Sequence, residues 1–345
     1  MDLARLVADI TTGQTAPIAR AVSIVENGRA GFEPLLAALH PHLGRAQRIG
    51  LTGPPGAGKS TVTEQLVRRC RQRGERVAVV AVDPSSPFSG GALLGDRIRM
   101  ESVALDPGVF IRSMATRGSL GGLATSTGEV CDVLDAGGFD RILIETVGVG
   151  QSELDVATMA DTTVLLLVPE SGDGIQALKS GVMEIADIFV INKADRPGAD
   201  RLAREIEITL GIRRGNAFAK IPAHHGVRHD GQPKPTLKPE DPGVWRQPVL
   251  LATAVRGEGM EAVVAALGAH RGWMDTHGEL ALRRRRRLAR RTRAVVDRAM
   301  HRWVWEEARA EEQIAARIDA VAAAQLSPYD LAGQIVQGLR EGARV

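Results

Sequence analysis

The chain of 345 residues is long enough for one α/β domain of about 200 residues together with smaller helical parts. Hydrophobic residues make up 44% and aromatic residues only 3%, so the core must be built mainly from aliphatic side chains. A net charge of +3 is too small to indicate a nucleic-acid partner, and no apolar run approaches the roughly 20 residues of a membrane helix. The first residues lack the layout of a secretion signal, and Cys70 and Cys131 lack metal-ligand spacing, so we expect a cytoplasmic protein with two reduced thiols.

Residues 1–46 have apolar positions at helical spacing and are predicted to form a helical N-terminal extension, interrupted at residues 11–13 and 28–31. Apolar runs then alternate with helical stretches. The runs lie at residues 49–52, 77–82, 142–144, 164–168, 188–191 and 249–251, with a shorter candidate strand at 109–111. Continuous apolar strands are buried on both faces, so the pattern predicts a mostly parallel central sheet flanked by helices.

Two segments depart from this alternation. Residues 213–247 are rich in proline and polar residues and are interpreted as a loop inserted into a domain spanning residues 47–275. Residues 276–345 are charged and helical, interrupted only at Ser327 and Pro328, and cannot join the sheet. This tail is either a second helical subdomain or an arm that packs on another chain. Its arginine run, residues 283–287 with Arg290, Arg291 and Arg293, is interpreted as a solvated helix face or an ion-paired dimer arm, because no aromatic side chain interleaves it.

A glycine-rich turn follows the first apolar run and has the pattern G-x-x-x-x-G-K-S. It consists of Gly53, Pro54, Pro55, Gly56, Ala57, Gly58, Lys59 and Ser60, and Thr61 continues into a helical stretch. Glycines let backbone N–H groups approach phosphates, and the helix N-terminus adds partial positive charge. We expect Lys59 to reach the β and γ phosphates and the Ser60 hydroxyl to bind Mg²⁺. The chain is therefore predicted to have the fold of a P-loop NTPase.

A second nucleotide signal comes directly after the run at residues 188–191, where Asn192, Lys193, Ala194 and Asp195 form N-K-x-D. The Asp195 carboxylate can accept hydrogen bonds from guanine N1–H and the exocyclic amine, which adenine does not offer. Charged hydrogen bonds contribute about 1.5–3 kcal/mol each, so this residue favours GTP over ATP. Thr253 and Ala254, after the last strand, are candidates for a backbone contact with the guanine oxygen.

Three acidic residues end or follow predicted strands at the same edge of the sheet. They are Asp83, Asp96 and Glu145, and Glu145 begins the stretch Glu145, Thr146, Val147, Gly148, where most GTPases have D-x-x-G. Acids near a Mg-triphosphate can hold the metal or orient water. We expect these three acids to join Ser60 at the magnesium site and Gly148 to sense the γ-phosphate.

The segments at residues 83–87, 90–97 and 145–153 resemble those of the methylmalonyl-CoA mutase-associated GTPases, the MeaB/ArgK-type metallochaperone family. The resemblance spans the whole chain and is most specific at residues 48–198. It implies a GTPase that forms a homodimer, partly through the helical arm. It also implies a chaperone of an adenosylcobalamin-dependent acyl-CoA mutase, which gates cofactor loading and protects or reactivates the enzyme. It further marks residues 172–179 as a mobile loop with Lys179 as a catalytic or coupling residue, alongside Lys59 and Glu145.

Other functions remain open at this point. A kinase could transfer the γ-phosphate of GTP to a small molecule or a protein. A nickel-delivery GTPase would normally carry a Cys/His cluster near the nucleotide domain, which the sequence lacks. The inserted loop contains His224, His225 and His229, and we interpret it as a solvent-exposed loop rather than a metal site. The insert leaves open which mutase is the partner.

Overall fold

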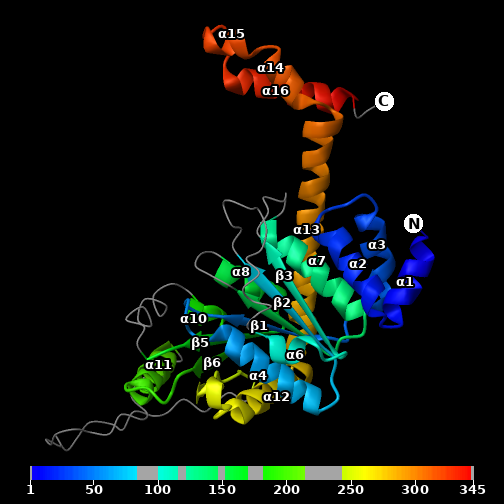
Figure 1. Ribbon diagram of the computed structural model, residues 1–345. Helices are drawn as coiled ribbons and strands as arrows, with labels where there is room; N and C mark the ends of the chain where they lie inside the picture. The colour runs from blue at the N-terminus through cyan, green and yellow to red at the C-terminus, as the bar shows by residue number, and fades with distance from the viewer. Residues whose placement is uncertain are drawn as a thin grey trace, which may run out of the picture.

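The computed structural model describes residues 2–83, 100–115, 122–146, 152–169, 182–213 and 243–342. Its centre is a seven-stranded parallel sheet with the order β3-β2-β4-β1-β5-β6-β7 (Figure 1). The strands are β1 Gln47–Thr52, β2 Val77–Asp83, β3 Val109–Ala115, β4 Arg141–Thr146, β5 Thr162–Leu167, β6 Ile188–Ile191 and β7 Val249–Leu251. Every predicted strand is present, including the short candidate at residues 109–111, so the predicted α/β fold is confirmed.

Helices cover both faces of the sheet, as the continuous apolar strands require. They are α4 Lys59–Gln72, α6 Glu101–Ala104, α7 Gly122–Ala136, α8 Ser152–Met159, α10 Val182–Ile185, α11 Ala199–Arg213 and α12 Met260–Thr276. Alternate residues of one strand enter different cores: Val77 and Val79 pack with α4, whereas Ala78 and Val80 pack with α7. Burial on both faces is the reason that these strands show no polar alternation.

The N-terminal extension consists of α1 Leu3–Thr11, α2 Thr15–Glu26, α3 Phe32–Leu39 and a 3₁₀ turn at His40–His42. The interruptions lie where the sequence predicted them. Ile10, Ile18 and Leu35 are fully buried and share one core with residues of α7 and with the β2–β4 face of the sheet. This extension therefore completes one helical layer over the sheet.

The arm, defined as α13 to α16, extends away from the sheet, with its last helices gathered at the far end (Figure 1). It comprises α13 Glu279–Arg302, a π-helical turn Trp303–Glu307, α14 Ala310–Ala315, α15 Ile318–Ala322 and α16 Pro328–Gly342. At 1.5 Å per residue, α13 is about 36 Å long. The expectation of a single interruption at Ser327 and Pro328 was wrong, because the chain also reverses at Arg309 and Ala324, which have positive φ values of 52° and 56°. These turns let the distal helices bury Ala310, Leu331 and Ile335 in a small core of their own.

The arginine run is divided between two faces of α13: four of its members are exposed and four form ion pairs within the chain. The exposed arginines are Arg285, Arg286, Arg290 and Arg293, and the paired ones are Arg283, Arg284, Arg287 and Arg291. Arg284 and Arg287 pair with the fully buried Asp161, at 3.1 and 3.0 Å. Similar pairs join Arg283 to Asp187, Arg291 to Asp132 and Arg298 to Glu129. These arginines recur at three- and four-residue spacing, so they lie on one face of α13, which docks it against α7 and the segments preceding β5 and β6. No helix among the described residues is long and apolar enough to cross a membrane.

Candidate nucleotide site

The phosphate loop occupies residues 53–58, between the end of β1 and the first residue of α4. Gly53 has a φ of +140°, and a Cβ there would lie 2.1 Å from the Leu166 carbonyl oxygen. Gly58 has a φ of +84°, and a Cβ there would lie 2.3 Å from Nδ2 of Asn192. Only glycine fits these two positions, because a side chain would meet both backbone strain and a neighbouring atom.

Lys59 and Ser60 begin α4, with Thr61 in the same first turn. The Lys59 ammonium is largely buried and donates to the carbonyl oxygens of Gly53 and Pro54, at 2.7 and 3.0 Å. The cation is therefore held directly over the loop. A triphosphate there would lie at a helix N-terminus, beside a buried positive charge.

Glu145 lies at the carboxyl end of β4, in register with Leu51 of β1, and its side chain is buried. Its Oε1 accepts a hydrogen bond from Ser60 Oγ at 2.6 Å, and its Oε2 accepts one from Thr63 Oγ1 at 2.9 Å. Thr63 was not predicted as a site residue from the sequence, although it follows the G-K-S motif by one helical turn. The structure thus brings together a carboxylate and a serine hydroxyl at the start of α4.

Two further threonine hydroxyls, of Thr52 and Thr146, are buried at the ends of β1 and β4 and have no hydrogen-bond partner among the described residues. Hard oxygen donors of this kind suit Mg²⁺, which usually takes one or two protein oxygens together with phosphates and waters. The donor set therefore fits a nucleotide-bound magnesium ion. In the described parts of the chain there is no group of three or more His, Cys, Asp or Glu that could hold a metal.

The base-reading segment follows β6. The Asn192 side chain is buried, with Nδ2 donating to the Ala57 carbonyl at 2.8 Å and Oδ1 accepting from the Ala254 amide at 3.1 Å. One amide thereby joins the phosphate loop, the N-K-x-D segment and the residues after β7. Lys193 has a positive φ of 56°, which turns the chain sharply there.

A cavity of about 310 Å³ lies beside Asp195. Its lining also includes Ala194, Leu251, Ala252, Thr253, Arg256, Glu258 and Gly259. Arg256 Nη2 lies 3.6 Å from Asp195 Oδ2, an interaction that the sequence did not indicate. Thr253 and Asp195, predicted from separate segments to read the base, therefore line the same cavity.

The structure leaves other predicted site residues unplaced. Asp83 ends β2 beside Ala115 of β3, but its side chain is outside the described set. Asp96, Gly148 and Lys179 lie outside the described residues, as does most of the predicted insert. Of the three predicted switch acids, the structure thus shows the contacts of Glu145.

Comparison with known proteins came from a family model and from individual relatives. The family model described as "Methylmalonyl Co-A mutase-associated GTPase MeaB" matches residues 18–309. A Pyrococcus horikoshii protein that is named as a GTPase is 39% identical over 332 residues, 96% of each chain. The mouse mitochondrial methylmalonic aciduria type A homolog is 37% identical over 294 residues, 81% of this chain and 66% of its own. The crystal structure of an LAO/AO transport system kinase has a TM-score of 0.64 at 26% identity, covering 98% of this chain and 97% of its own.

Proposed function

Because the chain belongs to the methylmalonyl-CoA mutase-associated GTPase family and is a GTPase, we propose that it serves as a chaperone of an adenosylcobalamin-dependent acyl-CoA mutase. The partner is methylmalonyl-CoA mutase or a related branched acyl-CoA mutase. The GTP cycle gates cofactor loading and protects or reactivates the enzyme. The observation that carries this proposal is the family match over residues 18–309, which includes α13 and not only the nucleotide motifs.

In the proposed GTPase mechanism, backbone N–H groups of the phosphate loop and α4 bind the phosphates. Lys59 exchanges its carbonyl contacts for the β and γ phosphates as GTP binds. Ser60 and Glu145, together with Asp83 and Asp96, would hold Mg²⁺, which would supply positive charge to neutralise the phosphates. Gly148 follows the γ-phosphate, so the segment after β4 responds to hydrolysis.

Guanine selectivity is assigned to Asp195, which faces the 310 Å³ cavity. In an Asp195→Asn variant, one acceptor becomes a donor that faces the guanine donors. GTP affinity should fall at least about tenfold while affinity for xanthosine triphosphate rises, because a charged hydrogen bond contributes about 1.5–3 kcal/mol. Titration calorimetry with both nucleotides measures this, and equal GTP binding by wild type and variant would reject the assignment.

The homodimer is proposed to form partly through the arm. Val296 and Met300 lie one turn apart on α13 and are 53% and 50% exposed, whereas Val304 and Leu326 pack in the arm's own core. Removal of the whole arm would also leave Asp161 and Asp187 without their arginines, so single substitutions are the cleaner test. Met300→Asp should convert a dimer to a monomer in light scattering. Arg286→Asp, at an exposed position of the same helix, is the control and should remain a dimer. A monomeric wild-type chain at micromolar concentration would contradict the proposal.

Coupling to the mutase is assigned to the loop that contains Lys179. A cation supplied to a slow GTPase commonly accelerates hydrolysis by about 10³–10⁵. Lys179→Ala should leave intrinsic GTP hydrolysis nearly unchanged and strongly reduce its stimulation by the mutase, whereas Lys238→Ala in the predicted insert serves as the control. Full stimulation of the Lys179 variant would exclude this loop and favour the segment from Asp83 to Asp96.

A kinase is the second candidate, because the LAO/AO transport system kinase, whose structure has a TM-score of 0.64 to this chain, is named for that activity. The two reactions differ in the acceptor of the γ-phosphoryl group. With γ-labelled GTP, the GTPase releases free phosphate, whereas a kinase transfers label to a small molecule or protein. Label that is found on an acceptor at the rate of GTP consumption would favour the kinase.

A further inference from the structure

Helix α8 connects the nucleotide edge of the sheet to the opposite edge. It follows the stretch that begins at Glu145, at the carboxyl end of β4, and it ends at Met159, two residues before Asp161 and β5. A Cβ at Gly50 of β1 would lie 2.3 Å from Val156 Cγ1, so α8 rests closely on the strand that leads into the phosphate loop. A displacement of the residues after Glu145 therefore acts directly on a closely packed helix.

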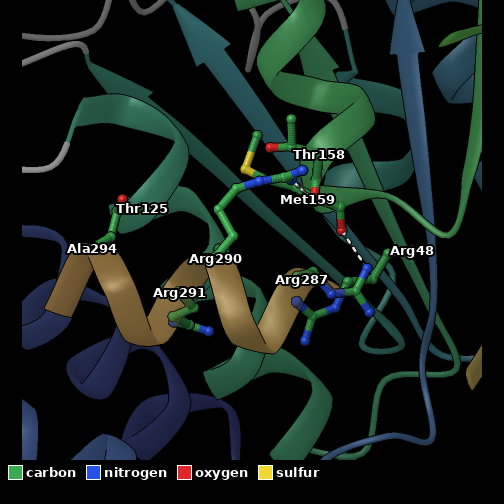
Figure 2. A pocket seen from close by; sticks show the side chains of 9 residues that line it. Arg48, Thr125, Thr158, Met159, Arg287, Arg290, Arg291 and Ala294 are labelled. Atoms are coloured by element: carbon green, nitrogen blue, oxygen red, sulfur yellow. Dashed lines mark hydrogen bonds between the residues drawn. The ribbon is translucent and has the colours of Figure 1, made fainter. Parts of the chain in front are cut away.

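The far end of α8 is bound by arginines of the arm. Arg287 Nη1 donates to the Met159 carbonyl at 2.8 Å, and Arg290 Nη1 lies 3.5 Å from the Thr158 carbonyl (Figure 2). The last carbonyls of a helix have no partner within the helix, and cations there also interact favourably with its dipole. Two side chains of α13 thus provide the C-terminal cap of α8.

The same arginine face anchors the next residues. Arg284 and Arg287 hold the Asp161 carboxylate, and Arg283 Nη1 donates to the Asp161 carbonyl at 3.0 Å. Asp161 Oδ2 also accepts from the Arg48 amide at 3.1 Å, which ties this point to β1. Several buried or half-buried contacts, and not one surface ion pair, therefore attach the end of α8 to the arm.

Space for movement lies beside this contact. A cavity of about 70 Å³ is bordered by Thr158 and Met159 of α8, Arg287 and Arg290 of α13, and Thr125 of α7 (Figure 2). Packed interfaces shift between discrete arrangements and do not deform continuously, and a void permits a small shift without a clash. The end of α8 can thus change position while its arginine contacts persist.

We infer that Arg287 and Arg290 are positioning residues of the GTPase cycle, which couple α8 to α13 so that the nucleotide state sets the placement of the arm. By reciprocity, the arm biases the segment that follows Glu145 and so the hydrolysis step. This inference rests on the proposed GTPase mechanism, in which the residues after β4 respond to the γ-phosphate. It assigns the arm a role in the cycle beyond joining two chains.

The test measures amide hydrogen exchange of the full chain with GDP and with a non-hydrolysable GTP analogue. In the wild type, exchange should differ between the two nucleotides in α8 and, at least about twofold, in α13. Arg290→Ala removes a contact to one carbonyl from an exposed side chain, so it should fold. Arg287→Ala/Arg290→Ala removes both carbonyl contacts and also the ion pair of Arg287 with Asp161. In both variants the α13 difference should shrink while the α8 difference remains. Arg286→Ala is the matched control, because Arg286 is exposed and contacts no carboxylate within the described part of the chain.

Kinetics provide an independent readout. Arg290→Ala should change kcat for GTP hydrolysis at least about threefold with KM within about twofold, and Arg290→Lys should restore part of the change. An α13 difference that persists in the double variant, or a wild type in which α8 responds and α13 does not, would overturn the inference. A chain in which even α8 is insensitive to nucleotide would instead overturn the proposed mechanism on which the inference rests.

Discussion

The buried carboxylate of Asp161 offers the sharpest test of how the arm is held to the nucleotide domain. Its side chain is fully buried and accepts from Arg284 and Arg287 at 3.1 and 3.0 Å. Asp161→Asn keeps the shape of the side chain but removes its charge. Loss of one partner of a buried ion pair costs about 3–5 kcal/mol, and the partly exposed arginines can recover some of this from water, so we expect about 2–4 kcal/mol.

Urea unfolding followed by tryptophan fluorescence measures this loss. With a slope of about 1–3 kcal/mol per molar urea, the midpoint should fall by about 1 M or more. Asp275→Asn is the control, because Asp275 pairs with Arg271 at 2.8 Å but is 51% exposed, and it should cost no more than about 0.5 kcal/mol. Equal losses in the two variants, or a loss below about 1 kcal/mol for Asp161→Asn, would refute the reasoning from burial. GTP affinity should be nearly unchanged, since Asp161 lies at the edge of the sheet opposite the phosphate loop.

Three further predictions concern acid unfolding, the glycines of the phosphate loop and the two cysteines. Burial alone would raise the pKa of Asp161, but Arg287 and Arg284 hold it below its usual range. The Asp161 ion pairs therefore stabilise the folded chain above the ordinary carboxyl pKa of about 3.9, and this stabilisation is lost as pH falls through the lower folded pKa. Acid unfolding of Asp161→Asn should thus depend less steeply on pH than that of the wild type. Gly58→Ala should weaken GTP binding at least about tenfold in calorimetry, because its Cβ would displace Asn192. Gly56→Ala, at a similar positive φ but with open space around the new Cβ, should weaken GTP binding less. Equal effects of the two substitutions would contradict the role of the Asn192 contact. Burial raises the pKa of the Cys70 thiol to about 12 and that of the Cys131 thiol to about 11. Neither thiol should therefore react with a thiol reagent at pH 8 until the chain is unfolded. Rapid labelling of the native chain would show that one of them is accessible.

Features whose chemistry is local could be predicted from the sequence alone. The turn from Gly53 to Ser60 was identified because only certain residues permit that backbone shape beside a phosphate, and the structure gives the glycines the φ values and close contacts that exclude side chains. The strands were identifiable because sheet burial on both faces requires uninterrupted apolar residues. The N-K-x-D segment has a local pattern as well, which identified Asp195 before the 310 Å³ cavity beside it was seen.

Tertiary structure decided which distant residues meet. Arg291 and Asp132 are 159 positions apart, and Arg287 and Asp161 are 126 apart, so no spacing rule could match them, although the recurrence of arginine on one face of α13 was visible. The same holds for Thr63 beside Glu145 and for Asn192, whose amide joins three segments. The reversals at Arg309 and Ala324 were also unpredictable, because the residues themselves favour continued helix and only burial of Ala310, Leu331 and Ile335 compensates the strain of their positive φ angles. The sequence thus determined the catalytic fold and the nucleotide class, whereas packing between remote segments decided how the arm is attached to it.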